Sequence, residues 1–267
     1  MFAMRSTPDR LTLLTAVLLL LVAAAAWGSV IVQATAMQPM GGAMGNTAPL
    51  APSPSLSAGE LLAFVVTWLV MMSAMMLPSA LPMVLLYRAT ARGQAARGNA
   101  LVPTWVFVVG YLLVWAGFGV LVYLARQLVA LAVASNMALA DAAPYDVAAV
   151  LLIAGAYQFT PLKRACLRTC QSPLSFLLGH WTPGPVGALR MGIEHGLYCT
   201  GCCWGLMAVL VVAGAMGLAW VVLIAVVVFV EKLLPRGQWA ATAAGVLLVA
   251  LGVVVALQPG VAMLIRA

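Results

Sequence analysis

Charged residues are scarce in this sequence. Asp, Glu, Lys and Arg make up 7% of its 267 residues, whereas hydrophobic residues make up 65%. A water-soluble domain carries about 25% charged residues, so this composition excludes an ordinary soluble enzyme or binding domain. The chain also has only six acidic residues and two histidines, which leaves few side chains for general acid–base catalysis. We therefore expect an integral membrane protein, with the lipid bilayer as its main surroundings.

Several catalytic motifs are also missing. The sequence has no phosphate-binding Gly-Lys-Ser/Thr loop, no G-x-S-x-G turn and no H-E-x-x-H helix. The net charge of +7 does not indicate a nucleic-acid partner, because the basic residues lie in short segments between apolar runs. No enzyme class is therefore predicted from motifs, and whether the protein is an enzyme stays open at this point.

About seven apolar stretches approach the roughly 20 residues that cross a membrane as a helix. Lipid offers no hydrogen bonds to an open strand, so all of them should be helical. We predict an all-α, polytopic transmembrane helix bundle. Residues 1–60 would form an amino-terminal anchor helix and a Met/Pro/Gly-rich outer loop, and residues 61–267 a six-helix membrane core. The predicted spans are residues 11–32, 61–87, 103–126, 147–162, 191–214, 218–234 and 240–265.

Basic residues indicate the orientation of these spans. Eleven of the 13 Lys and Arg residues fall on one side of a seven-span arrangement, which places the amino terminus in the cytoplasm. Ala34-Thr35-Ala36 would suit signal-peptide cleavage, although we favour a retained anchor because the apolar stretch is long. The residues on the cytoplasmic side are Arg5, Arg10, Arg88, Arg92, Arg97, Lys163, Arg164, Arg168, Arg190, Lys232 and Arg236.

All the cysteines fall in one part of the chain, on the predicted cytoplasmic side. The cytoplasm keeps thiols reduced, which favours metal binding or redox work over structural disulfides. His195, Cys199 and Cys202 stand at i, i+4 and i+7, so they share one helix face. Thiolate and imidazole together suit Cu(I) and Zn(II). Glu194 lies in or at the edge of the apolar run, where an ionisable residue needs a partner or a function. The five cysteines are Cys166, Cys170, Cys199, Cys202 and Cys203.

The same helix also has features of ordinary packing. Small residues at i, i+4 spacing let membrane helices approach closely, and a free cysteine can act as a small buried hydrophobe. Both interpretations of the segment, metal site and packing face, therefore remain open. The glycines concerned are Gly192, Gly196, Gly201 and Gly205.

Methionine thioethers provide a second group of candidate ligands. They bind soft cations such as Cu(I), although Met is also a common gap filler in packed cores. One set would line the second span and another lies in the outer loop, which together outline a copper path from outside inward. Glu231 could face the cysteines or, as we favour, pair with Lys163, while Lys232 would extend to the interface. The methionines are Met71, Met72, Met75, Met76, Met37, Met40 and Met44.

Four segments resemble a bacterial family of uncharacterised, predicted metal-binding integral membrane proteins. They are Met-Met-Ser-Ala-Met-Met-Leu-Pro at 71–78, Tyr-Gln-Phe-Thr-Pro-Leu-Lys at 157–163 with Cys170, His-Gly-Leu-Tyr-Cys-Thr-Gly-Cys-Cys-Trp at 195–204, and Glu231-Lys232. The resemblance covers residues 61–236. It implies a bacterial inner-membrane location and a metal site at Cys199, Cys202 and Cys203 with Cys170 nearby. It supplies neither the metal nor an activity.

Three functions follow as hypotheses. The first is a membrane protein that handles copper, which we favour over zinc, with a metal donor or a membrane complex as partner. The second is a membrane thiol–disulfide or metal-dependent oxidoreductase, since Cys199-Thr200-Gly201-Cys202 is a C-x-x-C. The third is a non-catalytic subunit of a membrane complex.

Overall fold

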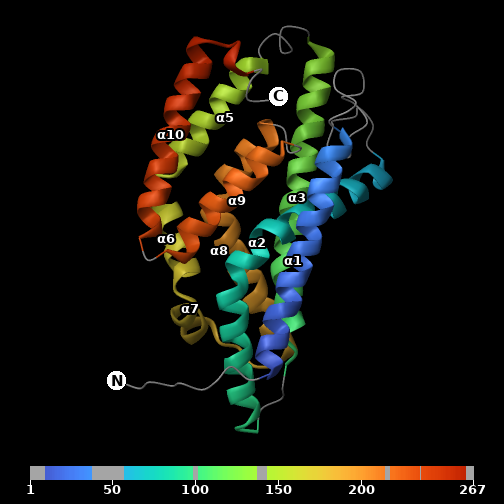
Figure 1. Ribbon diagram of the computed structural model, residues 1–267, viewed down its shortest axis with the longest axis vertical. Helices are drawn as coiled ribbons and strands as arrows, with labels where there is room; N and C mark the ends of the chain where they lie inside the picture. Colours follow the sequence, from blue (N-terminus) through green and yellow to red (C-terminus); the bar gives the residue numbers. More distant parts are fainter. Residues whose placement is uncertain are drawn as a thin grey trace.

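The computed structural model describes residues 10–37, 57–98, 102–136, 143–213, 217–234 and 236–262. Within these ranges the regular secondary structure is helical, and no strand occurs. The helices form an elongated bundle, shown in Figure 1. They are α1 (Arg10–Met37), α2 (Ala58–Ala95), α3 (Thr104–Ser135), α5 (Ala143–Tyr157), α6 (Pro161–Gln171), α7 (Pro173–His180), α8 (Gly184–Val212), α9 (Leu218–Leu233) and α10 (Gly237–Leu257).

Five or six helices of the described residues are candidates for crossing a membrane. Among the described residues, α1, α2, α3, α8 and α10 are long and apolar enough, and α5 with α6 makes a sixth candidate that is bent by 64°. Helix α9 is apolar but has only 16 residues, short of the roughly 20 that a span needs. By length and composition, the described residues thus contain five helices that could cross a membrane, or six with the bent pair, and the exact number of spans stays a prediction.

Two helices extend beyond their predicted ends. Helix α2 continues without a break through Pro78 and Pro82 as far as Ala95. Helix α3 continues past its predicted end at Arg126 as far as Ser135. The extension of α2 is polar, and the extension of α3 follows the polar pair Arg126-Gln127, so hydrophobicity alone placed both helix ends too early.

A sharp turn separates α5 from α6. The Thr160 hydroxyl accepts a hydrogen bond from the backbone N–H of Lys163 at 3.2 Å, and Pro161 occupies the first turn of α6. Threonine at the N-cap and proline just inside a helix both favour a new helix start. The predicted fourth span is short because a second helix, which carries Cys166 and Cys170, begins at this point.

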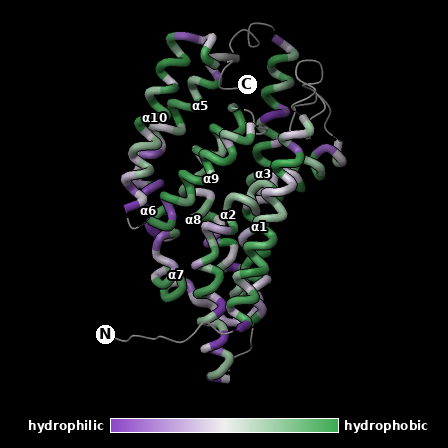
Figure 2. Tube along the Cα trace, viewed as in Figure 1, coloured by the Kyte–Doolittle hydropathy of each residue, from purple (hydrophilic) through white to green (hydrophobic). Residues whose placement is uncertain are grey.

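Helix α8 forms the centre of the bundle and contacts α3, α5, α6 and α9 (Figure 1). It meets α3 at very close range: a Cβ added to Gly192 would collide with the carbonyl oxygen of Phe107, and one added to Gly110 would collide with that of Leu189. The predicted packing role of the α8 glycines is thus confirmed at Gly192. Figure 2 shows hydrophobic residues along all the long helices, with hydrophilic ones mainly at helix ends and along α6.

Candidate metal centre

Cysteine sulfurs from two helices meet between α6 and α8. The Sγ atoms of Cys170 and Cys202 lie 3.9 Å apart, although the residues are 32 positions apart in the chain. Cys202 is buried, Cys170 is half-buried, and all five cysteines are free thiols. The short α6 helix is what brings Cys170 to α8, because the chain bends by 64° after α5 and α6 then packs against α8.

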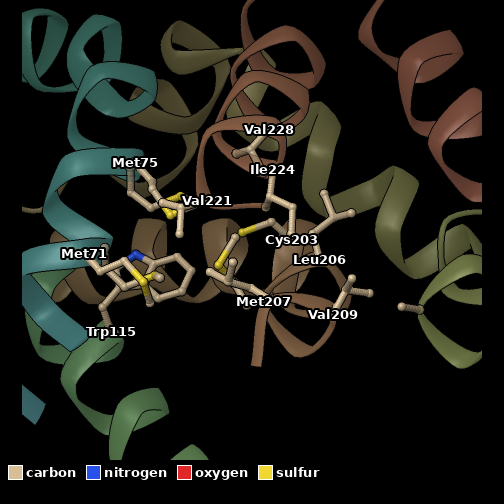
Figure 3. Close-up of a cluster of buried hydrophobic side chains, with 14 of the residues drawn as sticks. Met71, Met75, Trp115, Cys203, Leu206, Met207, Val209, Val221, Ile224 and Val228 are labelled. Atoms are coloured by element: carbon tan, nitrogen blue, oxygen red, sulfur yellow. The ribbon is translucent and has the colours of Figure 1, made fainter. Parts of the chain in front are cut away.

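Two of the three cysteine thiols of α8 form hydrogen bonds within their own helix. The thiols of Cys202 and Cys203 each donate a hydrogen bond to the backbone oxygen of Cys199, both at 3.0 Å. Cys203 lies in the hydrophobic core near Leu206 and Met207 (Figure 3). These carbonyl bonds satisfy buried thiols that would otherwise lack a partner.

Cys166 lies on the side of α6 that faces Gly201. A Cβ added to Gly201 would come within 2.8 Å of the Cys166 sulfur, so only glycine leaves room for this thiol. Cys166 is therefore close to α8, one turn of α6 before Cys170.

Lys232 lies beside the cysteines and does not extend to the interface. It is only 6% exposed, and its Nζ lies 2.9 Å from the Sγ of Cys199, 3.5 Å from the Oγ of Ser79 and 3.6 Å from the Sδ of Met76. The Tyr111 hydroxyl is also 3.1 Å from the Cys199 sulfur. Lys232 therefore places a buried ammonium against the Cys199 sulfur.

Glu231 pairs with Lys163, as the sequence favoured. Lys163 Nζ donates to the Glu231 carboxylate at 2.6 Å, and each side chain is 1% exposed. The Gln171 side-chain amide donates to the backbone oxygen of Glu231, also at 2.6 Å. These two bonds join α6 to α9, and so they position Cys170 relative to Lys232.

His195 is on the same helix as the α8 cysteines but lies among aromatic rings. Its ring centroid is 5.4 Å from that of Phe176, 5.8 Å from Tyr111 and 6.0 Å from Phe107. The residue is 3% exposed, and Nδ1 has no hydrogen-bond partner among the described residues. Glu194, one position earlier, points elsewhere and pairs with Arg190 at 2.8 Å on the exposed side of α8.

The predicted methionine face of α2 is buried in the core. Met71 and Met75 lie beside Trp115 (Figure 3), and each of the four methionines is at most 3% exposed. The sulfur of Met76 also contacts the Lys232 ammonium. The burial of Met71, Met72, Met75 and Met76 is what packing requires and equally what a thioether path would require. Met37 ends α1, while Met40 and Met44 lie outside the described residues.

A cavity of about 230 Å³ opens beside the cysteines. Its walls include Cys170, Cys199, His195, Lys232 and Ser79, together with residues at the ends of α6 and α9. The cavity therefore connects Cys170 and Cys199 with the buried cation and the His195 side chain.

The side chains are close to one another without forming a ready-made metal site. No group of three or more His, Cys, Asp or Glu side chains within the described ranges has the geometry to hold a metal ion. The expected set of His195, Glu194 and the cysteines is thus not assembled as such. The α8 thiols bond to a carbonyl, His195 lies among rings, and Glu194 is drawn away by Arg190.

Comparison with known protein families found one family that matches this chain. The model of a copper chaperone family, PpoB2, matches residues 65–255. The chain belongs to the PpoB2 copper chaperone family. The match begins within α2 and ends within α10, so it includes every cysteine and both residues of the buried ion pair. Comparisons with curated proteins and with solved structures gave no match. Membership of a copper chaperone family agrees with the expectation of copper over zinc.

Of the residues beside the cysteines in this PpoB2 family member, Tyr111 was missed in the sequence, and Lys232 was wrongly predicted to extend to the interface. Tyr111 gave no signal, because nothing in an apolar helix marks which of its aromatic residues will face a distant cysteine. Lys232 did give one: an ionisable residue at the end of an apolar run is a candidate functional residue by default. The direction in which the Lys232 side chain points could not be predicted, because α9 is apolar on all sides and periodicity does not mark the buried face of this helix.

Proposed function

We propose that this protein is an integral membrane chaperone that carries Cu(I) as cargo between α6 and α8. Cys170 and Cys202 would be the principal ligands, with Cys199 next to them and Cys203 and Cys166 within reach. The observation that carries the proposal is the 3.9 Å separation of the Cys170 and Cys202 sulfurs. Metal–thiolate bonds of about 2.3 Å, at the angle of a three-coordinate centre, place two sulfurs about 4 Å apart.

The kind of ligand favours Cu(I). Thiolates and thioethers are soft donors, and they select monovalent copper over hard cations such as Mg²⁺. Binding would require Cys202 to exchange its hydrogen bond to the Cys199 oxygen for a bond to the metal. That exchange is a rotation of a single side chain, and it suits a cargo that must be both taken up and released.

The surroundings favour a membrane location. Large hydrophobic side chains are exposed along α1, α3 and α10, and such extended apolar surface is rare on soluble monomers. The ends of α2 and α6 and the start of α8 carry basic residues, so we place this side of the bundle in the cytoplasm of a bacterium. The cysteines would then load or release copper near the inner face of the inner membrane.

The test uses the full chain, purified in detergent under anaerobic and reducing conditions. Wild-type protein loaded with Cu(I) should retain it through desalting against a soluble Cu(I) chelator. Cys170→Ser and Cys202→Ser should each lower the affinity for Cu(I) by at least about tenfold, since each removes a ligand outright.

Thr169→Ser and Thr200→Ser are matched controls, because they change residues close to the two cysteines without touching a sulfur. Both should bind Cu(I) as the wild type does. Equal copper retention by the wild type and by the double Cys170→Ser/Cys202→Ser variant would reject the site.

One alternative uses the same pair of sulfurs. Cys170 and Cys202 could form a disulfide if the sulfurs moved from 3.9 Å to about 2.05 Å, passing two electrons and two protons to a partner's disulfide. Trapping a mixed disulfide with a partner through Cys170 in the Cys202→Ala variant would favour this thiol–disulfide relay over copper transport.

A further inference from the structure

The cavity beside the cysteines reaches only part of the sulfur cluster. Cys170 and Cys199 line it, and Cys202 and Cys203 do not. Its volume of about 230 Å³ corresponds to roughly eight water molecules at about 30 Å³ each. A space of this size admits a molecule comparable to one amino acid and excludes a folded domain.

The cavity wall carries a buried positive charge that is not held in an ion pair within the described residues. Lys232 is 6% exposed and forms no ion pair among the described residues, where Glu231 is paired with Lys163 and Glu194 with Arg190. The contacts of its Nζ are a thiol, a hydroxyl and a thioether. Because a buried cation without a counter-ion is unfavourable, an anion in the cavity would be attracted to Lys232.

A second buried polar group borders the same space. His195 is 3% exposed, lines the cavity, and has no hydrogen-bond partner at Nδ1 within the described part of the chain. His195 thus contributes a buried polar ring to the cavity lining next to Lys232.

We propose that this cavity binds a small thiol that also bears a carboxylate, and that this molecule delivers or removes Cu(I). The carboxylate would pair with Lys232, and the sulfur would lie next to Cys199 and Cys170. The inference rests on the proposed copper function and adds the chemical class of the exchange partner.

The transfer is a ligand exchange that leaves copper in the +1 state. A bond from Cu(I) to the Cys199 sulfur forms as its bond to the sulfur of the small thiol breaks. The proton of the Cys199 thiol passes to the departing thiolate, so charge and atoms balance and no oxidant is needed. The reverse sequence unloads the protein.

The test measures anion preference without copper. Variants of the full chain that retain either Cys199 or Cys166 as the sole cysteine, the others being alanine, are reacted with two thiosulfonate reagents. One reagent carries a sulfonate and the other a trimethylammonium group. Cys199 lines the cavity and Cys166 does not, so Cys166 is the internal control.

The test compares the ratio of the reaction rate of the anionic reagent to that of the cationic one. This ratio should be at least about tenfold higher at Cys199 than at Cys166. Lys232→Met should abolish this preference, and Lys232→Arg should keep it. The ratio of the two reagents cancels any effect of Lys232 on the reactivity of Cys199 itself. Equal ratios at the two cysteines, or a preference that survives in Lys232→Met, would overturn the proposal.

A second measurement uses copper and compares mercaptoacetate with cysteamine, a thiol that carries an amine in place of the carboxylate. Cu(I) supplied with mercaptoacetate should transfer to the wild type at least about tenfold faster than Cu(I) supplied with cysteamine. To Lys232→Met, Cu(I) should transfer equally fast from both thiols. Retention of Cu(I) without any anion preference would refute the cavity proposal alone. An anion preference in protein that fails to retain Cu(I) would refute the proposed function alone.

Discussion

The buried ion pair between Lys163 and Glu231 is the point at which the position of Cys170 can be tested most sharply. The two groups are 2.6 Å apart, each is 1% exposed, and they connect α6 to α9. Removing one partner leaves an unpaired charge in the core, which typically costs about 3–5 kcal/mol. We therefore expect Glu231→Leu, which strands the Lys163 ammonium, to lower the free energy of unfolding by about this amount.

Replacing both partners should reverse most of that loss. The double variant Lys163→Met/Glu231→Leu removes both charges and keeps comparable volume, so its cost should be smaller than that of Glu231→Leu. The Arg190–Glu194 pair provides the matched control: its atoms are also close, at 2.8 Å, but its side chains are 70% and 24% exposed. Arg190→Met/Glu194→Leu and each of its single variants should change stability by less than about 1 kcal/mol.

The measurement is equilibrium unfolding in mixed detergent micelles, followed by helical circular dichroism and arranged as a double-mutant cycle for each pair. The Lys163–Glu231 cycle should give a coupling energy of at least about 2 kcal/mol and the Arg190–Glu194 cycle one near zero. If Glu231→Leu proved no more destabilising than Glu194→Leu, the argument that this pair holds α6 against α9 would be wrong.

Two further outcomes concern the contacts around α8. Gly192→Ala should lower stability by about 1–3 kcal/mol, because the added Cβ would collide with the Phe107 carbonyl, whereas Gly117→Ala, with open space around it, should be neutral in the same unfolding assay. Tyr111→Phe should cost about 1 kcal/mol through loss of its hydrogen bond to Cys199, measured likewise, while the protein retains Cu(I) in the chelator assay. Loss of copper from Tyr111→Phe would show that the hydroxyl belongs to the site.

Much of the fold could be predicted because lipid imposes a simple rule. Every backbone group in a bilayer must bond within its own helix, so apolar runs of sufficient length are helices wherever they occur. The extents of α2 and α3 could not be predicted in the same way. The last two turns of α2 are polar, and in α3 the pair Arg126-Gln127 interrupts the apolar run although the helix continues beyond it, so hydrophobicity does not report either helix end.

The residues of the candidate site could be predicted from the sequence, but their arrangement in space could not. The clustering of cysteines around Cys170 and Cys199 indicated where the chemistry would lie, and family membership agrees with copper. The direction of Lys232 and the bonding of Cys202 to a backbone oxygen could not be inferred. Both depend on how α9 and α6 rotate against α8, and no residue pattern within a uniformly apolar helix encodes that rotation.

The amino-acid sequence by itself determined that this chain is helical, apolar and equipped with soft ligands in one region, because composition and residue type need no partner to act. Only the tertiary structure decided which of those ligands meet. The bend at Thr160 lets α6 pack against α8, and the Lys163–Glu231 pair joins α6 to α9. Close contact between distant residues arises from packing, and packing exists only once the helices are assembled.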